Sequence, residues 1–392
     1  MVKKNKKKSR KSKSHKEFLI NIGVLIATIF VFLIFFEVVL RLTVDYELFP
    51  QNVDTLAYNN VSGVSFKPNI EGLYNSKVET RYHFKTNNLG WRDDDVFPEK
   101  TRFRVEIVGD SVTAGTGVDQ TEMFTEVLEK ELLDNKVEII NFGLGATGTG
   151  QQLSYFENKA KYYSPDMVIL EFSVANDWAN NEGAYKKLPY YTLENNTLKL
   201  NNFPPKEIEL TEITYSFPLN IHVFFSNNLY TYNFLYKRLL SIKFIRQILL
   251  KSDFTRKGLA FLSVEMFNAN ASYYQDSYLV TRALIDAFAK SAKEINSSFY
   301  VLIVPTKEQV YEQDWQAVVN ANDLGFELDR DLPTNKLSEI CEDLNLSCIN
   351  LLPVFREKAS KGNRFHFHLD AHPTGSGHRI IAEVIYEQLL KK

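Results

Sequence analysis

The stretch RVEIVGDS, Arg104–Ser111, decides the fold of this chain. It is a β-branched run that ends in a turn, which predicts a buried strand. Four more runs of this kind follow, and helical patterns lie between most of them. Strands that alternate with helices predict a parallel sheet covered on both faces. The predicted strands are Arg104–Ser111, Lys136–Gly143, Ser164–Ser173, Ser298–Pro305 and Leu346–Leu352.

The helical patterns complete this picture. After the first strand, Phe124, Val127 and Leu128 recur at helical spacing. We therefore expect a three-layer α/β/α sandwich over residues 101–392, interrupted by an irregular insertion at about 178–275. The predicted helices are Thr121–Leu133, Thr149–Tyr163, Ser277–Ile295, Thr334–Leu344 and Gly375–Leu390.

The insertion contains one long aromatic and basic helical stretch, Asn228–Leu250. We expect its Tyr, Phe and Leu side chains to pack onto the sheet domain, with membrane contact by its Lys and Arg side chains as the alternative. The segment 41–100 ahead of the sheet is rich in Asn and Tyr. It contains a predicted short strand at Lys77–Thr86 and a turn at Asn87–Gly90.

The N-terminus combines a basic head, residues 1–17, with a long apolar run, Phe18–Leu40. Only Asn21 and Glu37 are strongly polar in that run, and its length matches the roughly 20 residues that a helix needs to cross a bilayer. A cleavable signal peptide would have a shorter apolar stretch followed by a small-x-small site. We expect an uncleaved single-pass anchor, with the head in the cytoplasm and the remaining chain outside.

The charge distribution argues against nucleic-acid binding. Nine of the 46 Lys and Arg residues lie in residues 1–16, where there is no acidic residue. The remaining 37 basic residues face 48 acidic ones, a net charge of −11. Nucleic-acid binding needs clustered cations to replace counterions, and the basic head is followed at once by the membrane span.

The two cysteines, Cys341 and Cys348, have six residues between them. Two thiols cannot build a structural zinc site on their own. Outside the cytoplasm they can pair, but placement on a helix and a strand can also hold them too far apart. We favour two buried thiols and leave a disulfide open.

Polar residues gather at the carboxyl ends of the predicted strands, which is where ligands bind in parallel sheets. Ser111 ends the first strand, and its hydroxyl is a poor nucleophile until a base takes its proton. A tetrahedral oxyanion also needs donors fixed in advance, and loss of one typically costs about 2.7–4 kcal/mol. The candidate donors are the backbone N–H groups of Ser111 and of Gly145 or Ala146, and the side-chain amide of Asn176.

A base is available ahead of the last predicted helix. His372 has a near-neutral reference pKa, and Asp370 can fix the tautomer of its imidazole. Asp110 and Asp177 are expected to form hydrogen bonds within their loops. The other histidines of the C-terminal region, His366, His368 and His378, are interpreted as surface residues.

Gly-Asp-Ser after the first strand, Asn-Asp after the third and Asp-x-His before the last helix resemble the sequence blocks of the SGNH hydrolases, in the order of that family. The resemblance covers residues 101–392 apart from the insertion. NNLGWRDDD, Asn87–Asp95, is similar to the segment before the first block in membrane-anchored bacterial members. The resemblance implies a flavodoxin-like sheet and an ester hydrolase without cofactor or metal, with Ser111 as nucleophile and His372 as base.

The chain departs from the family pattern at three small places and through its large insertion. Ala146 and Val174 stand where the family usually has glycine, so Gly145 is an alternative donor to Ala146. Asp370 lies two residues before the histidine instead of three, a spacing that resembles the branch associated with polysaccharide O-acetylation. The unusual insertion leaves the choice of substrate open.

Two other motifs are interpreted as decoys. GLGATG, Gly143–Gly148, fits a dinucleotide-binding pattern, but it follows the second strand and that pattern belongs on the first. The spacing His-x-His-x-Asp-x-His over 366–372 suggests a metal cluster, but a hydrolytic metal site needs further ligands and only His378 follows.

The sequence therefore predicts a serine esterase that removes O-acyl groups, with O-acetyl favoured, from cell-envelope or extracellular glycans. A polysaccharide O-acyltransferase, a lipid esterase and a non-catalytic glycan-binding or assembly protein are the alternatives. The expected partners are an acylated glycan or lipid ester and the membrane through residues 18–40.

Overall fold

The computed structural model divides the chain into two compact units. One comprises residues 1–50 with 215–249, and the other comprises 51–214 with 250–392. The structure describes residues 2–43, 55–75, 79–145, 147–181, 183, 188–206, 224–225, 228–241, 264–269, 273–320, 322, 325–368 and 370–391.

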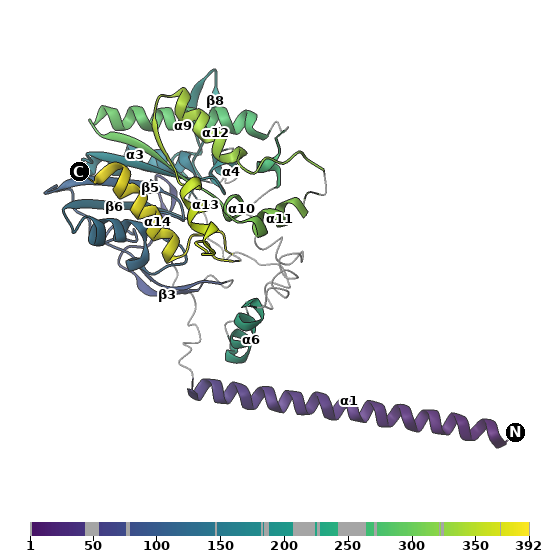
Figure 1. Cartoon of the computed structure of the whole chain (residues 1–392). Coiled ribbons are helices and arrows are strands. Elements are labelled where there is room, and N and C mark those ends of the chain that lie inside the picture. Colours follow the sequence, from purple (N-terminus) through teal and green to yellow (C-terminus); the bar gives the residue numbers. More distant parts are fainter. Residues whose placement is uncertain are drawn as a thin grey trace. The chain divides into compact units, whose positions relative to one another are not determined.

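The larger unit is built on a central sheet with helices around it (Figure 1). The sheet has five strands in the order β11-β10-β7-β5-β6, and every pair of neighbouring strands is parallel. In chain order this arrangement is 5-4-3-1-2, the flavodoxin-like order with its switch point between β5 and β7. The prediction of a five-stranded parallel sheet is confirmed. The strands are β5 (Phe103–Gly109), β6 (Val137–Gly143), β7 (Met167–Ser173), β10 (Ser298–Val304) and β11 (Ser347–Asn350).

Helices cover both faces of this sheet. Side chains alternate between faces along a strand, so Ile107 belongs to one buried cluster and the adjacent Val108 to the other. Two buried faces explain why these strands are almost wholly apolar. The Val108 face packs against α3 (Thr149–Asn158), α9 (Tyr273–Glu294) and α12 (Leu332–Asp343). The Ile107 face packs against α2 (Phe124–Glu126), α13 (Leu352–Ser360) and α14 (Gly375–Ile385).

Three antiparallel hairpins accompany the sheet. Two precede it in the chain and belong to the same unit, so residues 55–100 form part of the larger unit. The third lies within the segment interpreted as an irregular insertion. The hairpins are β1 (Leu56–Asn59) with β2 (Gly63–Phe66), β3 (Glu71–Asn75) with β4 (Arg81–Lys85), and β8 (Tyr190–Glu194) with β9 (Thr197–Asn201).

The smaller unit contains α1 (Val2–Thr43) and α6 (Tyr230–Ser241). Within α1, residues Ile20–Thr43 are long and apolar enough to cross a membrane. The described part of the helical stretch 228–250 is α6, which packs against α1 within this unit, and residues 242–250 lie outside the described residues. The ring of Phe234 meets that of Phe36 edge-on at 5.4 Å, which gives α6 an apolar partner on α1.

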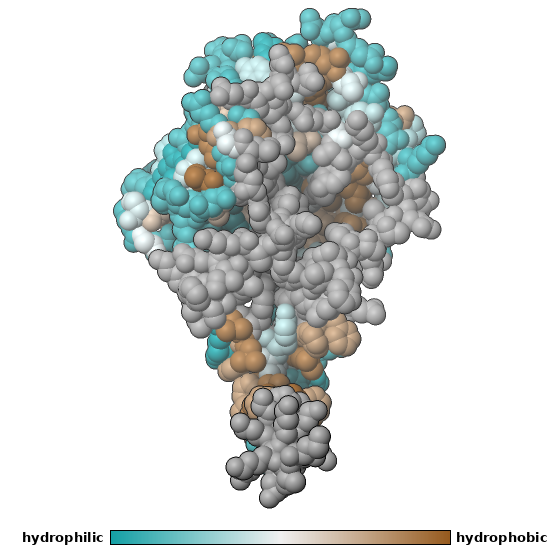
Figure 2. Space-filling model, turned by 90° about the vertical axis from the view of Figure 1, so that its right-hand side faces the viewer, coloured by the Kyte–Doolittle hydropathy of each residue, from teal (hydrophilic) through white to brown (hydrophobic). Residues whose placement is uncertain are grey.

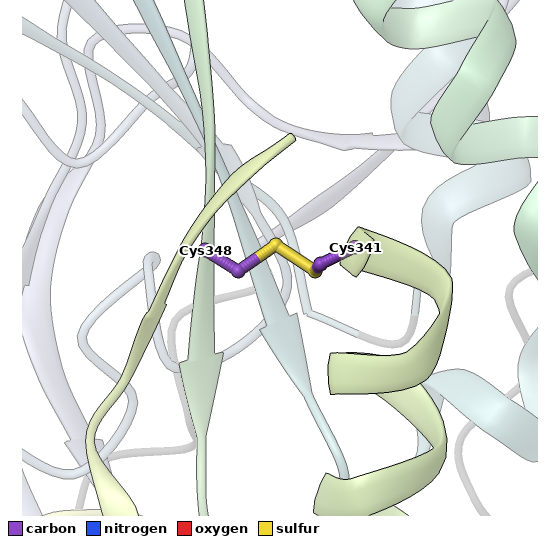
Figure 3. The surroundings of a disulfide bond; sticks show 2 residues. All are labelled: Cys341 and Cys348. Atoms are coloured by element: carbon purple, nitrogen blue, oxygen red, sulfur yellow. A yellow bond between two sulfur atoms is a disulfide. The ribbon is translucent and has the colours of Figure 1, made fainter. Parts of the chain in front are cut away.

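Our preference for two free thiols is wrong, because Cys341 and Cys348 form a disulfide (Figure 3). Cys341 lies in the last turn of α12 and Cys348 in β11, and the Cα atoms are 6.2 Å apart. That distance lies within the range a disulfide requires. The helix turns back directly into the strand, so a helix-to-strand placement brings these residues together.

Candidate active site

A serine, a histidine and an aspartate form a continuous hydrogen-bonded chain at the carboxyl end of the sheet. Ser111 lies in the turn that follows β5, and its Oγ is 2.7 Å from Nε2 of His372. Nδ1 of the same ring contacts Oδ1 of Asp370. An ionised Asp370 accepts the Nδ1 proton, which leaves Nε2 free to accept the proton of Ser111. Ser111 and His372 are 261 residues apart in sequence, and the fold brings them together.

The contact between Asp370 and His372 shifts the pKa of both side chains. Burial raises the pKa of Asp370, but the charge and hydrogen bonds of His372 and the charge of Lys307 outweigh it and lower the pKa to about 2. Burial lowers the pKa of His372, but the charge and hydrogen bond of Asp370 outweigh it and raise the pKa above 6.5. Asp370 is therefore ionised at neutral pH, and its charge favours the protonated form of the imidazole.

The backbone N–H groups of Ser111 and Gly145 are the described candidates for binding an oxyanion. A Cβ built on Gly145 would lie 3.8 Å from Cβ of Ser111, so the turn after β6 passes directly beside the serine. Within the described residues, neither the N–H of Gly145 nor that of Ser111 donates to a protein acceptor. The side chain of Asn176, in the turn after β7, makes no hydrogen bond to a described residue either. Ala146, the alternative donor, lies outside the described residues.

The glycines of the GLGATG motif allow close packing around the nucleophile turn. A Cβ on Gly143 would lie 2.2 Å from the backbone nitrogen of Ala114, and one on Gly148 would lie 2.5 Å from Cβ of Asn180. Neither position tolerates a side chain without displacing its neighbour. Contact with the nucleophile turn and with α4 (Asp177–Asn181) accounts for these two glycines.

Two charged side chains hold the loop that carries His372. Glu79 accepts the backbone N–H groups of His368 and Asp370 at 2.9 and 3.2 Å. Nζ of Lys307, which lies in α10 (Lys307–Val310), donates to the carbonyl oxygens of the same two residues, both at 3.1 Å. The loop is thus fixed through its backbone on both sides. Sequence reasoning missed both residues, because neither belongs to a recognisable motif.

Arg92 holds the loop that follows the nucleophile. Its guanidinium is buried and donates to the carbonyl oxygens of Ala114, Gly115 and Val118 at 3.0, 2.5 and 2.9 Å. A further bond goes to the carbonyl of His83 at 3.2 Å. Burial lowers the pKa of Arg92 to about 10, so the group stays charged at neutral pH. The NNLGWRDDD segment pointed to this region but not to the role of its arginine.

Three carboxyl groups are buried beneath the nucleophile turn. Oε2 of Glu171, in the middle of β7, accepts the N–H of Asp110 at 3.2 Å and the hydroxyl of Thr113 at 3.0 Å. Burial and the neighbouring carboxylates of Asp110 and Asp177 raise the pKa of Glu171 well above its usual value. As expected, Asp110 accepts a loop N–H, from Val112, and Asp177 accepts one from Ser173. Through these two hydrogen bonds Glu171 ties β7 to the turn that follows β5.

The interpretation of the other histidines as surface residues is wrong for two of them. His366 is buried, with its ring nitrogens 3.4 Å from the hydroxyl of Tyr311 and 3.3 Å from the carbonyl of Pro305. His378 is buried too, and Nδ1 accepts the N–H of Phe124 at 3.3 Å. Burial lowers the pKa of both rings to about 3. They act as neutral core residues, and only His372 meets the serine.

No family model matches the chain, and no curated protein matches it at a significant level. Solved structures to which it is similar include an acetyl xylan esterase, at 13% identity and a TM-score of 0.37, covering 73% of this chain and 100% of the other. An acetyl-xylooligosaccharide esterase from Geobacillus has 11% identity and a TM-score of 0.39, covering 76% and 98%. The esterase EstA from Pseudoalteromonas has 13% identity and a TM-score of 0.35, covering 74% and 97%. The case for the chemistry of this chain rests on the side chains described above.

Proposed function

We propose that this chain is a serine ester hydrolase of the SGNH type. The observation that carries the proposal is the continuous contact from Asp370 through His372 to Ser111. A hydroxyl next to a neutral imidazole, which is itself oriented by a carboxylate, is the arrangement that makes serine a nucleophile. The adjacent N–H groups of Ser111 and Gly145 supply donors for the oxyanion, which is the other requirement of acyl transfer.

The reaction follows from these positions. His372 takes the proton of Ser111 while Oγ attacks the ester carbonyl, and the negative charge develops on the carbonyl oxygen. The imidazolium then gives its proton to the departing alcohol, which leaves an acyl group on Ser111. Water, activated by the same imidazole, attacks this acyl-enzyme and releases the acid. If a sugar hydroxyl takes the place of water, the same site transfers the acyl group.

For the location, we propose an uncleaved anchor at residues 18–40 that keeps the catalytic unit outside the cytoplasm. Three observations support it. Residues Ile20–Thr43 form a helix of spanning length and composition, preceded by a basic head. The disulfide fits an oxidising compartment. The outer end of α1 also holds α6 through Glu37 and Arg41, contacts that would be lost if a peptidase removed the helix.

We infer an acylated glycan as the substrate. The extracytoplasmic location places such esters within reach, and the Asp-x-His spacing resembles the polysaccharide O-acetylation branch. The rivals are a transfer reaction to a glycan hydroxyl and hydrolysis of a lipid ester. Product analysis distinguishes transfer from hydrolysis. With an added glycan acceptor, transfer forms acylated glycan faster than free acid, whereas hydrolysis forms only the acid.

The test is the loss of activity in Ser111→Ala. Purified full-length protein should hydrolyse a short-chain aryl acetate and become labelled by a fluorophosphonate, and Ser111→Ala should abolish both. Ser360, an exposed serine whose hydroxyl donates to the carbonyl of Glu357, supplies the matched control variant. Full activity in Ser111→Ala would refute the nucleophile assignment. Absent labelling in well-folded wild-type protein would favour a glycan-binding protein.

A further inference from the structure

An acidic side chain lies inside the apolar span of α1 and has defined partners. The carboxylate of Glu37 accepts the backbone N–H groups of Tyr230 and Thr231 at 3.1 and 2.8 Å, and Nε of Arg41 at 2.8 Å. A charged group within a membrane span is costly unless it is paired in this way. Glu37 therefore satisfies the first N–H groups of α6 and fixes the start of that helix beside the last turns of the span.

Further contacts hold the same end of α6. The guanidinium of Arg41 lies 5.1 Å from the ring of Tyr230 and donates to the carbonyl of Asn228 at 2.8 Å. The edge-on pair of Phe36 and Phe234 adds an apolar contact, and Phe36 lies deeper in the span than Arg41. Because Phe36 belongs to the apolar run and Arg41 follows it, α6 begins at the depth where hydrocarbon gives way to headgroups.

Several apolar side chains in and just before α6 are exposed. Leu235 and Leu239, one helical turn apart, are 43% and 42% exposed, and Phe224 just before α6 is 60% exposed. In Figure 2, hydrophobic residues gather around α1 and α6 at the bottom of the view. The guanidinium of Arg238 lies 3.5 Å from the ring of Phe234, so the same helix carries a cation beside its apolar side chains. Apolar residues beside a snorkelling cation are typical of a helix at a membrane interface.

We infer that α6 is a second membrane contact, an interfacial helix docked on the outer end of the anchor through Glu37. Its partner is the bilayer itself, where headgroups meet acyl chains. The inference rests on the proposed uncleaved anchor, because the depth of α6 is set by residues Phe36 to Arg41. It gives part of the large insertion a role that the catalytic chemistry does not require.

The test is depth-dependent quenching in full-length protein reconstituted in phosphatidylcholine–phosphatidylglycerol liposomes. Single cysteines carrying an environment-sensitive fluorophore replace Leu235, Val31 in the span, or Tyr162, which is 68% exposed in the larger unit. The native cysteines are paired and do not react with the label. Nitroxide lipids should quench the labels at positions 31 and 235 several-fold more than the label at 162.

The outcomes separate the two proposals. Quenching at position 31 without quenching at 235 would overturn the interfacial helix and leave the anchor standing. Quenching at neither position would overturn the anchor and the helix together.

A second measurement tests the role of Glu37. Cysteines replacing Phe36 and Phe234 should be joined efficiently by a short bis-maleimide, and Glu37→Ala should lower that yield several-fold. Glu37→Gln, which keeps an acceptor oxygen, should lower it less. An unchanged yield in Glu37→Ala would refute docking through this carboxylate.

Discussion

Replacing Asp370 with Asn should slow the reaction and move its pH dependence to lower pH. The contacts of Asp370, with His372 as the main partner, lower its pKa from 3.8 to about 2 despite burial. A difference of roughly two pKa units corresponds to about 2.5 kcal/mol. Because the attraction is mutual, the same carboxylate raises the pKa of His372. Without it, the pKa of the imidazole should fall, since burial then dominates.

The rate should fall for a different reason. Asn offers an amide in place of a carboxylate, so it no longer imposes the Nδ1-protonated tautomer or stabilises the imidazolium. In the serine protease triad this change lowers kcat by roughly 10⁴-fold, and we expect a loss of about 10³- to 10⁴-fold here. Glu79 and Lys307 bind backbone atoms of the loop and not the Asp370 side chain, so the loop should keep its position in the variant.

The assay is kcat/KM for an aryl acetate as a function of pH at constant ionic strength. The neutral imidazole is the base, so activity falls as the pH drops below the pKa of His372 in the free enzyme. The acid limb should lie above 6.5 in the wild type and below it in Asp370→Asn. Asp286→Asn, which removes an exposed ion-pair partner of Lys290 in α9, is the control and should match the wild type. An acid limb that stays in place or moves up in Asp370→Asn would refute the reasoning.

Two further predictions concern stability. Arg92→Lys should lower the free energy of unfolding by about 2–4 kcal/mol, because an ammonium cannot replace the guanidinium at the three buried carbonyls of Ala114, Gly115 and Val118, and each orphaned buried carbonyl costs about 1–3 kcal/mol. In denaturant unfolding, a loss no larger than that caused by Arg379→Lys, at an exposed position, would contradict this. Reducing the Cys341–Cys348 disulfide should lower the same free energy by about 2–3 kcal/mol, the chain-entropy value for so short a loop. A variant with Ser in place of both Cys341 and Cys348 should show the same loss without reductant. Free thiols in untreated wild-type protein would contradict the pairing.

The sheet was predictable because its signals are local. Each strand is an apolar run of the length of a buried strand, and the helices between them carry their own periodicity. The candidate triad was predictable for a related reason. Ser111 and His372 each stand at an element boundary, and parallel strands bring such boundaries to one edge.

The groups that hold the site were not predictable in this way. Glu79 and Lys307 act through backbone atoms of the loop that carries His372, and Arg92 acts through carbonyl oxygens. A contact to a backbone atom does not depend on the residue type at the contacted position, so the sequence does not reveal it. The buried state of His366 and His378 was missed because polar side chains enter the core only where a specific neighbour satisfies them.

The sequence by itself determined the order of strands and helices, the apolar span and the candidate residues Ser111, Asp370 and His372, because periodicity, length and residue chemistry are properties of short segments. The tertiary structure alone decided that Cys341 and Cys348 pair, that α6 packs on α1, and which side chains hold the two loops of the candidate site. These are contacts whose partners and distances depend on how the chain folds back on itself, and no short stretch of sequence encodes both sides of them.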